Sequence, residues 1–495
     1  MAQPLDPQLR LLTSLNLSPR GRHNILPHYL WTNDYIIDEE STKPLLFLNW
    51  ISRCFVRDAS GDSDYDKVSV AASLTMDSYV LYIATSRGVA DQTDHEYSDQ
   101  FLAVCREIFD SQSHLLATGQ QADVFQDTRK VMDCIVDRVW KRFLRKIAML
   151  RTQFLANGGF KTLDSLVRAW QSWRTTKEKG GERSADIIAL ARHYTDGDNY
   201  AMFRKIFEVI LDEDYAAQSY QSRELQVQYF IRITSLSRAL FKSSFFRDGC
   251  RRDFPEADAS YFFRQTVRRL WRVQFYYSGA LYFAGPWMKS CRSAFQTYGG
   301  SFCSIIWVGS TTPKTVTFPT SLRETLASIL RRQSVKFSED DLDAWFQVRS
   351  MRLVDSAWKE GRPRILRPHP EIQIMNFLRS SDISVIGNTV GSSKRMCEVC
   401  ILYAEVFEEI SNTGVSFVFT PRDDPATKSI VDNDWMLPAP SENISFQNVV
   451  NEVVDRVINK FSIEADRLFA TKFYHWLHPY LDDPWCYRES FSPGY

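Results

Sequence analysis

The residues H-P-E at 369–371 and S-K-R-M-C-E-V-C at 393–400 decide how this chain is organised. One imidazole and two thiols three residues apart are typical zinc ligands, and three protein ligands leave a fourth position open for water. A carboxylate two residues after the histidine can carry the protons of such a water molecule. The stretch therefore indicates a metal centre that can support hydrolytic chemistry.

The composition is that of a soluble globular protein with two or three domains. The chain has 495 residues, of which 44% are hydrophobic and 24% are charged, and both fractions are ordinary for globular proteins. The formal net charge is zero, so a nucleic-acid partner would need a local basic patch. No run approaches the ~20 apolar residues of a membrane helix, and the first residues lack the apolar core of a signal peptide. We therefore expect no membrane partner.

The nine cysteines do not form a disulfide framework. Seven of them are scattered along the chain, and only Cys397 and Cys400 form a C-x-x-C pair. An odd and scattered set fits a reducing compartment, so we expect a cytoplasmic or nuclear protein.

The amino-terminal part contains the best hairpin signal of the chain. Residues 1–43 show no clear period and are expected to be a loose lead-in. Residues 44–57, PLLFLNWISRCFVR, place apolar side chains on one face of a helix. Within 68–88, VSVAASLT and YVLYIATSRG are two β-rich runs separated by a turn at Asp77 and Ser78. A helix followed by a β-hairpin is therefore predicted here.

From about residue 97 to residue 362 helical periodicity dominates. The predicted helices span 97–110, 119–155, 161–175, 184–195, 199–212, 222–247, 258–283, 320–332 and 339–360. A β-like patch at 301–319, SFCSIIWVGS and TVTFPT, predicts another hairpin inside this helical region.

After residue 362 strands and helices alternate. The predicted elements are a helix at 370–380, a strand at 382–387, a helix at 397–411, a strand at 415–421 and a helix at 444–470. Both halves of the metal motif thus lie at helix starts, where free N–H groups and the helix dipole favour thiolates and a carboxylate. Cysteines at i and i+3 share one face, so both sulfurs can reach one ion.

At these residues the chain resembles the cytidine-deaminase-like superfamily, in particular the divergent branch that is greatly expanded in fungi. That branch shows H-[AP]-E-[IV]-Q-[LI] and then I-G-x-S-K-x-x-C-x-x-C, and this chain has H-P-E-I-Q-I at 369–374, I-G at 386–387 and S-K-R-M-C-E-V-C at 393–400. The W-x-L-P at 435–438 is similar to the branch as well. The resemblance implies the following roles: zinc ligands His369, Cys397 and Cys400, and catalytic proton carrier Glu371.

The resemblance also implies a fold, a three-layer α/β/α core around a mixed sheet. Because that core begins with a hairpin before the H-x-E helix, the hairpin at 68–88 is assigned to it. The fold class is then an α/β core with a large, mostly helical insertion. The predicted parts are a lead-in, the first part of the core, the insertion, the second part of the core with the zinc motif, and an aromatic tail: 1–43, 44–88, 89–363, 364–470 and 471–495.

The chain departs from the family pattern at three places. Met396 stands where the superfamily has a proline. The segment NTVG at 388–391 looks like an insertion that lengthens the loop over the pocket. Thr85 and Ser86 stand where an asparagine that contacts the substrate sugar is common, so the sequence does not predict that ribose contact.

Two functions remain open at this point. The resemblance implies a zinc-dependent hydrolytic deaminase acting on cytosine or a related amino-base, in a free nucleotide or in single-stranded nucleic acid. The alternative is a catalytically inactive module with a structural zinc, which binds protein partners through its helical insertion. A structural site needs a fourth ligand, which His475 or Cys486 could supply.

Two stretches of the insertion, 128–151 and 264–277, interleave basic and aromatic residues. Such interleaving suits contacts to a nucleic-acid backbone together with base stacking. An ordinary amphipathic helix gives the same pattern, and nearby acidic residues and the zero net charge favour that interpretation. The residues concerned are Arg138, Lys141, Arg142, Arg145, Lys146, Arg268, Arg269, Trp271 and Arg272.

Overall fold

The structure, a computed structural model, describes most of the chain between residues 43 and 478. The described residues are 43–57, 66–74, 78–177, 199–243, 245–246, 260–298, 303–309, 312–317, 321–348, 363–394, 396–411, 417–419, 435–436 and 443–478. The predicted lead-in, apart from residue 43, and the predicted helix at 184–195 lie outside the described residues.

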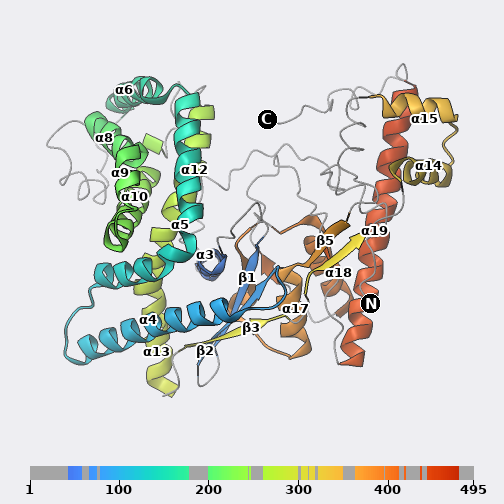
Figure 1. The fold of residues 1–495 in the computed structure, drawn as a ribbon. Helices are drawn as coiled ribbons and strands as arrows, with labels where there is room; N and C mark the ends of the chain where they lie inside the picture. Colours follow the sequence, from blue (N-terminus) through green and yellow to red (C-terminus); the bar gives the residue numbers. More distant parts are fainter. Residues whose placement is uncertain are drawn as a thin grey trace.

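A five-stranded mixed sheet lies at the centre of the molecule (Figure 1). Its strand order is β3-β2-β1-β6-β7, with bounds Val68–Leu74 for β1, Tyr79–Thr85 for β2, Cys303–Val308 for β3, Thr389–Ser392 for β6 and Val418–Phe419 for β7. β1 is antiparallel to β2 and to β6, whereas β3 runs parallel to β2 and β7 runs parallel to β6. The predicted hairpin of β1 and β2 is confirmed.

Both faces of this hairpin are buried, and alternate side chains pack against different layers. Val70 belongs to the core that includes α3 (Lys43–Phe55). Its neighbour Ala71 packs on the other face with Ile374 of α17 (Pro370–Ser380). Because successive side chains of a strand point to opposite faces, helices cover both sides of the sheet here. A mixed α/β core accompanied by a helical part is thus confirmed.

β1 also pairs with β6, the strand that lies between the two halves of the metal motif. Ser69 is opposite Ser392 in this ladder. The Ser393 N–H donates to the Val68 carbonyl over 2.8 Å, and the Val68 N–H donates to the Ser393 hydroxyl over 2.9 Å. Segments 325 residues apart in the sequence therefore meet beside the motif.

A smaller sheet of three strands leads into the first motif helix. Its order is β4-β5-β8, with bounds Lys314–Thr317, Pro363–Pro368 and Trp435–Met436. The hairpin predicted at 301–319 is wrong, because β3 pairs with β2 and β4 pairs with β5 in different sheets. An isolated hairpin would bury few of the side chains of either run. As a strand of the large sheet, by contrast, β3 buries Cys303 to 1% exposure.

The strand predicted at 382–387 is also wrong, because the strand begins after that segment. The backbone is left-handed at both of its ends, with φ of 50° at Asp382 and 59° at Gly387. β6 instead occupies Thr389–Ser392, so most of the NTVG segment is strand and not a loop insertion. Pairing with β1 and complete burial of Val390 outweigh the local apolar signal of D-I-S-V-I-G.

Helices make up most of the other described residues. Between β2 and β3 lie α4 (Gln92–Ala117), α5 (Val124–Ala156), α6 (Gly159–Lys177), α8 (Asn199–Leu211), α9 (Glu213–Gln218), α10 (Arg223–Lys242), α12 (Ser260–Tyr282), the π-helix η3 (Phe283–Trp287) and α13 (Met288–Tyr298). Further along lie α14 (Leu322–Arg332), α15 (Glu339–Phe346), the 3-10 turn η4 (Ile386–Asn388), α18 (Glu398–Ser411) and α19 (Ile444–Leu477). No helix of the described ranges is both long and apolar enough to cross a membrane.

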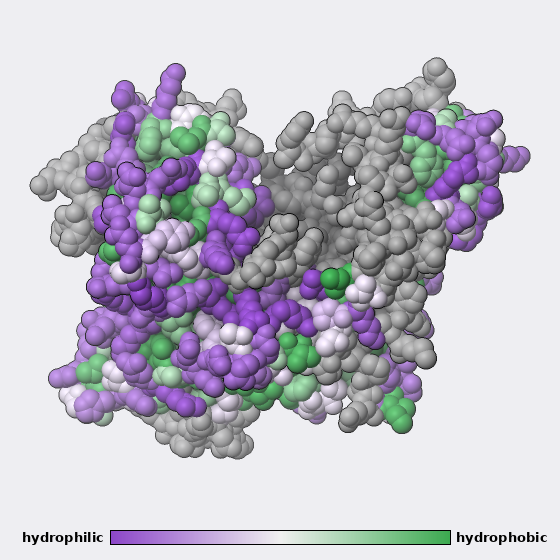
Figure 2. All heavy atoms as spheres, viewed as in Figure 1, coloured by the Kyte–Doolittle hydropathy of each residue, from purple (hydrophilic) through white to green (hydrophobic). Residues whose placement is uncertain are grey.

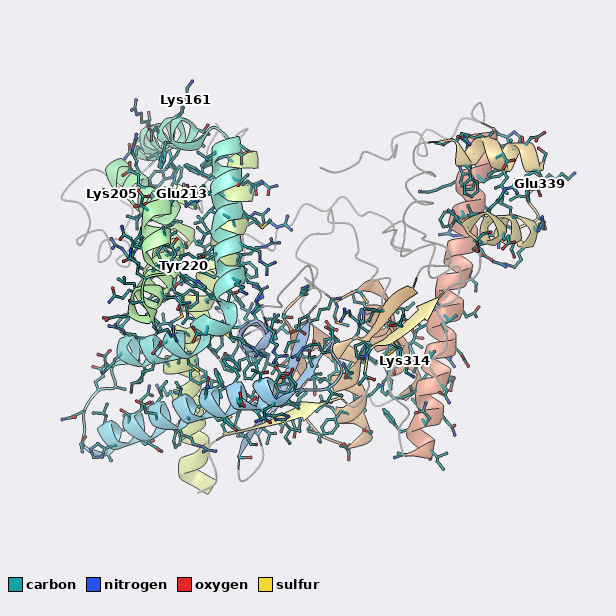
Figure 3. The ribbon with its side chains drawn as sticks, viewed as in Figure 1. Lys161, Lys205, Glu213, Tyr220, Lys314 and Glu339 are labelled. Atoms are coloured by element: carbon teal, nitrogen blue, oxygen red, sulfur yellow. The ribbon has the colours of Figure 1, made fainter. Side chains whose placement is uncertain are left out.

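The helices that follow β4 do not join the bundle that precedes β3. In α15, Trp345 packs edge-on against Phe473 of α19, with ring centroids 5.0 Å apart. Figure 3 shows Glu339 of α15 on the opposite side of the molecule from Lys161 of α6. α19 continues to Leu477, so the predicted tail starts inside this helix and not after residue 470.

Gly391 marks the point where α3 crosses β6, and it offers a test of this packing. A Cβ atom there would lie 2.3 Å from the carbonyl carbon of Leu48 and 2.6 Å from the backbone nitrogen of Asn49. We expect Gly391→Ala to lower the free energy of unfolding by about 1–3 kcal/mol in urea denaturation, because backbone atoms must move apart. The control is Gly285→Ala, whose Cβ would meet only Val124 at 3.5 Å; equal losses in both variants would contradict the close crossing.

Candidate metal centre

His369 lies at the junction of β5 and α17. It is the N-cap residue of α17 with an extended backbone, and Pro370 follows in the first turn, where its missing N–H costs nothing. β5 is the middle strand of its sheet. Hydrogen bonds to β4 and β8 therefore fix the strand that ends just before His369. The helix predicted at 370–380 is confirmed, and the imidazole is buried.

The two cysteines lie at the start of α18. Cys397 precedes the helix and Cys400 is in its first turn, and the Cys400 N–H donates to the Cys397 sulfur over 3.4 Å. Both thiols are buried. The helix predicted at 397–411 is confirmed with a start at Glu398. Free N–H groups and the positive end of the helix dipole favour a thiolate at this position.

The structure brings the three predicted ligands together. The Nδ1 atom of His369 lies 3.0 Å from Cys400 Sγ and 3.4 Å from Cys397 Sγ, and the two sulfurs are 3.3 Å apart. A tetrahedral site with Zn–S of ~2.3 Å and Zn–N of ~2.0 Å has edges of about 3.5–3.8 Å between its ligand atoms. The triangle formed by these three atoms is slightly smaller than that. Small outward movements of the side chains would therefore make room for the ion. These three residues can hold a metal ion.

The two thiols differ in their pKa values. Burial raises the pKa of Cys397, but hydrogen bonds with Cys400 and His369 and the charge of the imidazole outweigh burial, and its pKa lies well below the usual value. Burial also raises the pKa of Cys400, and the neighbouring Cys397 raises it further. The pair therefore tends to hold one proton. A divalent ion favours the loss of that proton, because its charge stabilises both thiolates.

Glu371 lies near this cluster but outside the ligand set. The carboxylate is 1% exposed, and its Oε1 atom accepts a hydrogen bond from the Ser392 hydroxyl over 2.8 Å. Its Oε2 atom is buried without a hydrogen-bond partner among the described residues. Glu371 lies in the first turn of α17, two residues after His369, and its charge raises the pKa of Cys400. An unpartnered buried carboxylate oxygen fits a site that takes up a further molecule or ion.

No fourth ligand joins the triad within the part of the chain that the structure describes. The group of His, Cys, Asp and Glu side chains that can share an ion contains three members. Residue 475, suggested as a fourth ligand, lies in the last turns of α19 beside Phe473, which packs against Trp345. Figure 1 shows α15 at the end of α19 that is remote from α17. Cys486 lies outside the described residues.

The end of the hairpin lies against the first turn of α17. The side chain of Gln373 donates to the Thr85 carbonyl over 3.0 Å, and the Thr85 hydroxyl donates to Asp66 over 2.9 Å. The hydroxyl of Ser86 accepts a hydrogen bond from the Lys67 N–H over 2.9 Å. The side chains of Thr85 and Ser86 thus form hydrogen bonds that fix the end of the hairpin.

Sequence reasoning missed two polar residues that support the site, Ser392 and Asn49. The Asn49 side chain accepts a hydrogen bond from the Ser392 N–H over 2.7 Å. A signal for Asn49 was available, since it is a polar residue in the apolar run P-L-L-F-L-N-W-I. Ser392 carried no such signal, because its strand was expected to be a loop.

The basic residues predicted on α5 mostly serve the interior of the fold. Arg142 donates to the carbonyls of Arg53 and Val56 at the end of α3, over 3.1 and 2.6 Å. Lys146 donates to the Tyr276 hydroxyl over 2.8 Å, and burial places its pKa well below the usual value. These contacts favour the amphipathic-helix interpretation over a nucleic-acid groove. Figure 2 shows hydrophilic and apolar residues intermixed on the visible face of this region.

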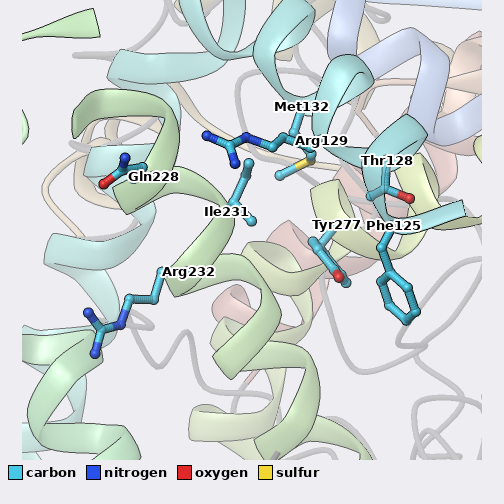
Figure 4. Close-up of a pocket in the computed structure, with 8 residues that line it drawn as sticks. All are labelled: Phe125, Thr128, Arg129, Met132, Gln228, Ile231, Arg232 and Tyr277. Carbon is cyan, nitrogen blue, oxygen red and sulfur yellow. The ribbon is translucent and has the colours of Figure 1, made fainter. Parts of the chain in front are cut away.

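A separate cavity lies in the helical bundle, between α5, α10 and α12. Its volume is about 320 Å³, and it contains no residue of the metal cluster (Figure 4). Apolar and polar groups line it together: Phe125, Thr128, Arg129, Met132, Gln228, Ile231, Arg232 and Tyr277. Arg232 already stacks on the ring of Tyr215, with its guanidinium 5.3 Å from the centroid.

The cluster of His369, Cys397 and Cys400, with Glu371 nearby, is the candidate functional site. Its chemistry is specific, because three buried ligands and a nearby carboxylate come from two helix starts joined by one strand. Comparison of the chain with protein-family models, with curated protein sequences and with solved structures finds no match.

Proposed function

We propose that this protein is a zinc-dependent hydrolytic deaminase that acts on cytosine or a related amino-base, in a nucleotide or in nucleic acid. The observation that carries the proposal is the unpartnered Oε2 atom of Glu371, buried beside three ligands with no fourth among the described residues. A structural zinc site has four protein ligands, whereas a catalytic one has three and an open position. The resemblance of the two motifs to the cytidine-deaminase-like superfamily supports the same reaction.

The residues present fit the chemistry of zinc. One imidazole and two thiolates are the donor set of His369, Cys397 and Cys400, and they would hold the ion. When bound, Zn²⁺ acts as a Lewis acid and lowers the pKa of water toward neutrality. The resemblance also supports zinc over softer or redox-active metals at this donor set.

The reaction needs a group that moves protons, and Glu371 is the candidate. Its Oε2 atom would accept a proton from the attacking water while the oxygen bonds to the ring carbon that bears the amine. Glu371 would then give this proton to the ring nitrogen, and would carry the second proton, from the newly added hydroxyl, to the leaving amine. The products are an oxo-base, which carries a carbonyl in place of the amine, and ammonia. Together they contain all the atoms of the amino-base and the water.

Ammonia release tests the proposal directly. Zinc-loaded protein is incubated with cytidine, its nucleotides, adenosine, single-stranded DNA and RNA, and ammonia and the deaminated base are both quantified. We expect equimolar ammonia and oxo-base from a cytosine or related substrate, loss of activity after chelation, and recovery with added zinc. Full zinc occupancy without turnover of any of these substrates would favour the alternative, an inactive module with a structural zinc ion.

A further inference from the structure

The hydroxyl of Ser392 and the carboxylate of Glu371 meet across two elements of the core. We infer that Ser392, fixed by Asn49, is a positioning residue that turns the Oε2 atom of Glu371 toward the metal centre. This inference rests on the proposed function. It assigns a task to two side chains that belong neither to the ligand set nor to the proton carrier.

The contact makes the two oxygens of the carboxylate unequal. The Ser392 hydroxyl has one proton, and it donates that proton to Oε1 of Glu371 over 2.8 Å. Oε2 has no partner among the described residues. Both side chains are buried, at 5% and 1% exposed, so water does not compete freely for Oε1. The hydrogen bond therefore leaves Oε2 as the oxygen that has no partner.

The backbone that carries this hydroxyl is itself held from the far side. Asn49 of α3 accepts a hydrogen bond from the Ser392 N–H over 2.7 Å and is 4% exposed. The neighbouring Gly391 lets α3 approach the strand, since a Cβ there would overlap the backbone of Leu48. The backbone of Ser392 is thus held on one side by Asn49 of α3. On the other side it pairs with Ser69 of β1. A hydroxyl on a strand held in this way has little freedom to move.

A purely structural hydrogen bond would have different consequences from a positioning one. Loss of a structural bond lowers stability and leaves the reaction unchanged in the molecules that remain folded. Loss of a positioning contact lowers kcat with little change in KM, because the substrate still binds but the proton carrier is misaligned. Contacts of this kind around metal sites change activity by about 10- to 100-fold.

The test compares Ser392→Ala and Ser392→Thr in the full chain with Ser73→Ala as the matched control. Ser73 is also buried, lies on the adjacent strand β1, and donates to the Tyr82 hydroxyl over 3.2 Å. We expect Ser392→Ala to lower kcat by about 10- to 100-fold with KM within about twofold. Ser392→Thr, which keeps the hydroxyl, should restore most of kcat, and Ser73→Ala should keep it.

A second measurement does not depend on turnover. Each variant is loaded with Co²⁺, whose visible absorption reports the coordination of the metal. We expect all variants to bind one ion per chain. The spectrum of Ser392→Ala should differ from that of the unmodified chain, because the carboxylate of Glu371 is no longer held in one orientation, whereas Ser392→Thr and Ser73→Ala should keep the spectrum of the unmodified chain. Should Ser392→Ala not fold, Asn49→Ala is expected to shift the spectrum in the same direction.

The outcomes separate the two proposals. Absence of deaminase activity in the unmodified chain would end the proposed function, while the cobalt spectra would still report on the position of Glu371. Unchanged spectra and unchanged kcat in both Ser392→Ala and Asn49→Ala would overturn the positioning role. An equal loss of kcat in Ser73→Ala would assign the effect to general weakening of the sheet.

Discussion

Replacing Glu371 by glutamine is expected to abolish ammonia release while the protein keeps its metal ion. Glutamine has the size of glutamate, and its carbonyl oxygen can still accept the hydrogen bond that Ser392 donates over 2.8 Å. The amide, however, cannot take up a proton at neutral pH. General acid–base catalysis contributes about 10²- to 10⁴-fold, so kcat should fall by at least that factor.

The measurement is ammonia release at saturating substrate together with zinc content by elemental analysis. Glu409→Gln serves as the control, because Glu409 is an exposed residue of the same helix as Cys400 and forms a surface pair with Lys460 at 3.5 Å. Such exposed pairs contribute little, so this variant should keep both activity and zinc. Turnover by Glu371→Gln near the level of the unmodified chain would remove Glu371 from the mechanism.

Replacing Cys400 by alanine is expected to empty the metal site. The variant keeps one imidazole and one thiol, and two ligands hold zinc poorly. Changes to residues that merely support metal ligands cost about 10- to 100-fold in affinity, so loss of a ligand itself should cost more than about 100-fold. Competition with a chromogenic chelator measures the affinity, and elemental analysis measures the occupancy.

Cys303→Ala is the matched control for the loss of a buried thiol, because Cys303 is 1% exposed and lies on β3 outside the cluster. It should retain one ion per chain. The affinity of the unmodified chain should rise with pH, because the Cys400 thiol, whose pKa is raised, must lose its proton on binding. Each proton that is released on binding should raise the metal affinity by about tenfold per pH unit. Tight binding by Cys400→Ala would exclude this ligand set.

The ligand cluster could be predicted from the sequence because its chemistry is local. His369 with Glu371, and Cys397 with Cys400, are close in sequence, and each pair lies at a helix start whose signals are short-ranged. The hairpin of β1 and β2 was predictable for the same reason, since its two strands are separated by only a few residues.

The pairing of the other strands in the large sheet could not be predicted, because their partners are distant, although the strand predicted at 415–421 does contain β7. β3 pairs with β2 and β6 pairs with β1 across gaps of more than two hundred residues, and no local pattern marks such partners. The run D-I-S-V-I-G looks more like a strand than T-V-G-S, yet the latter fits between β1 and β7. Tertiary pairing decides such cases, because the strand propensities differ by less than the free energy of burial.

The meeting of α3 with β6 has a consequence for how the protein is made. Asn49 and Ser392 are 343 residues apart, and ribosomes add about 5–20 residues per second. About 20–70 s therefore pass between synthesis of the two ends of this contact. During that interval the nascent hairpin has an unpaired edge along β1 and no Glu371 to align. Assembly of the metal centre must be a late event, after which the hydroxyl and the carboxylate come together.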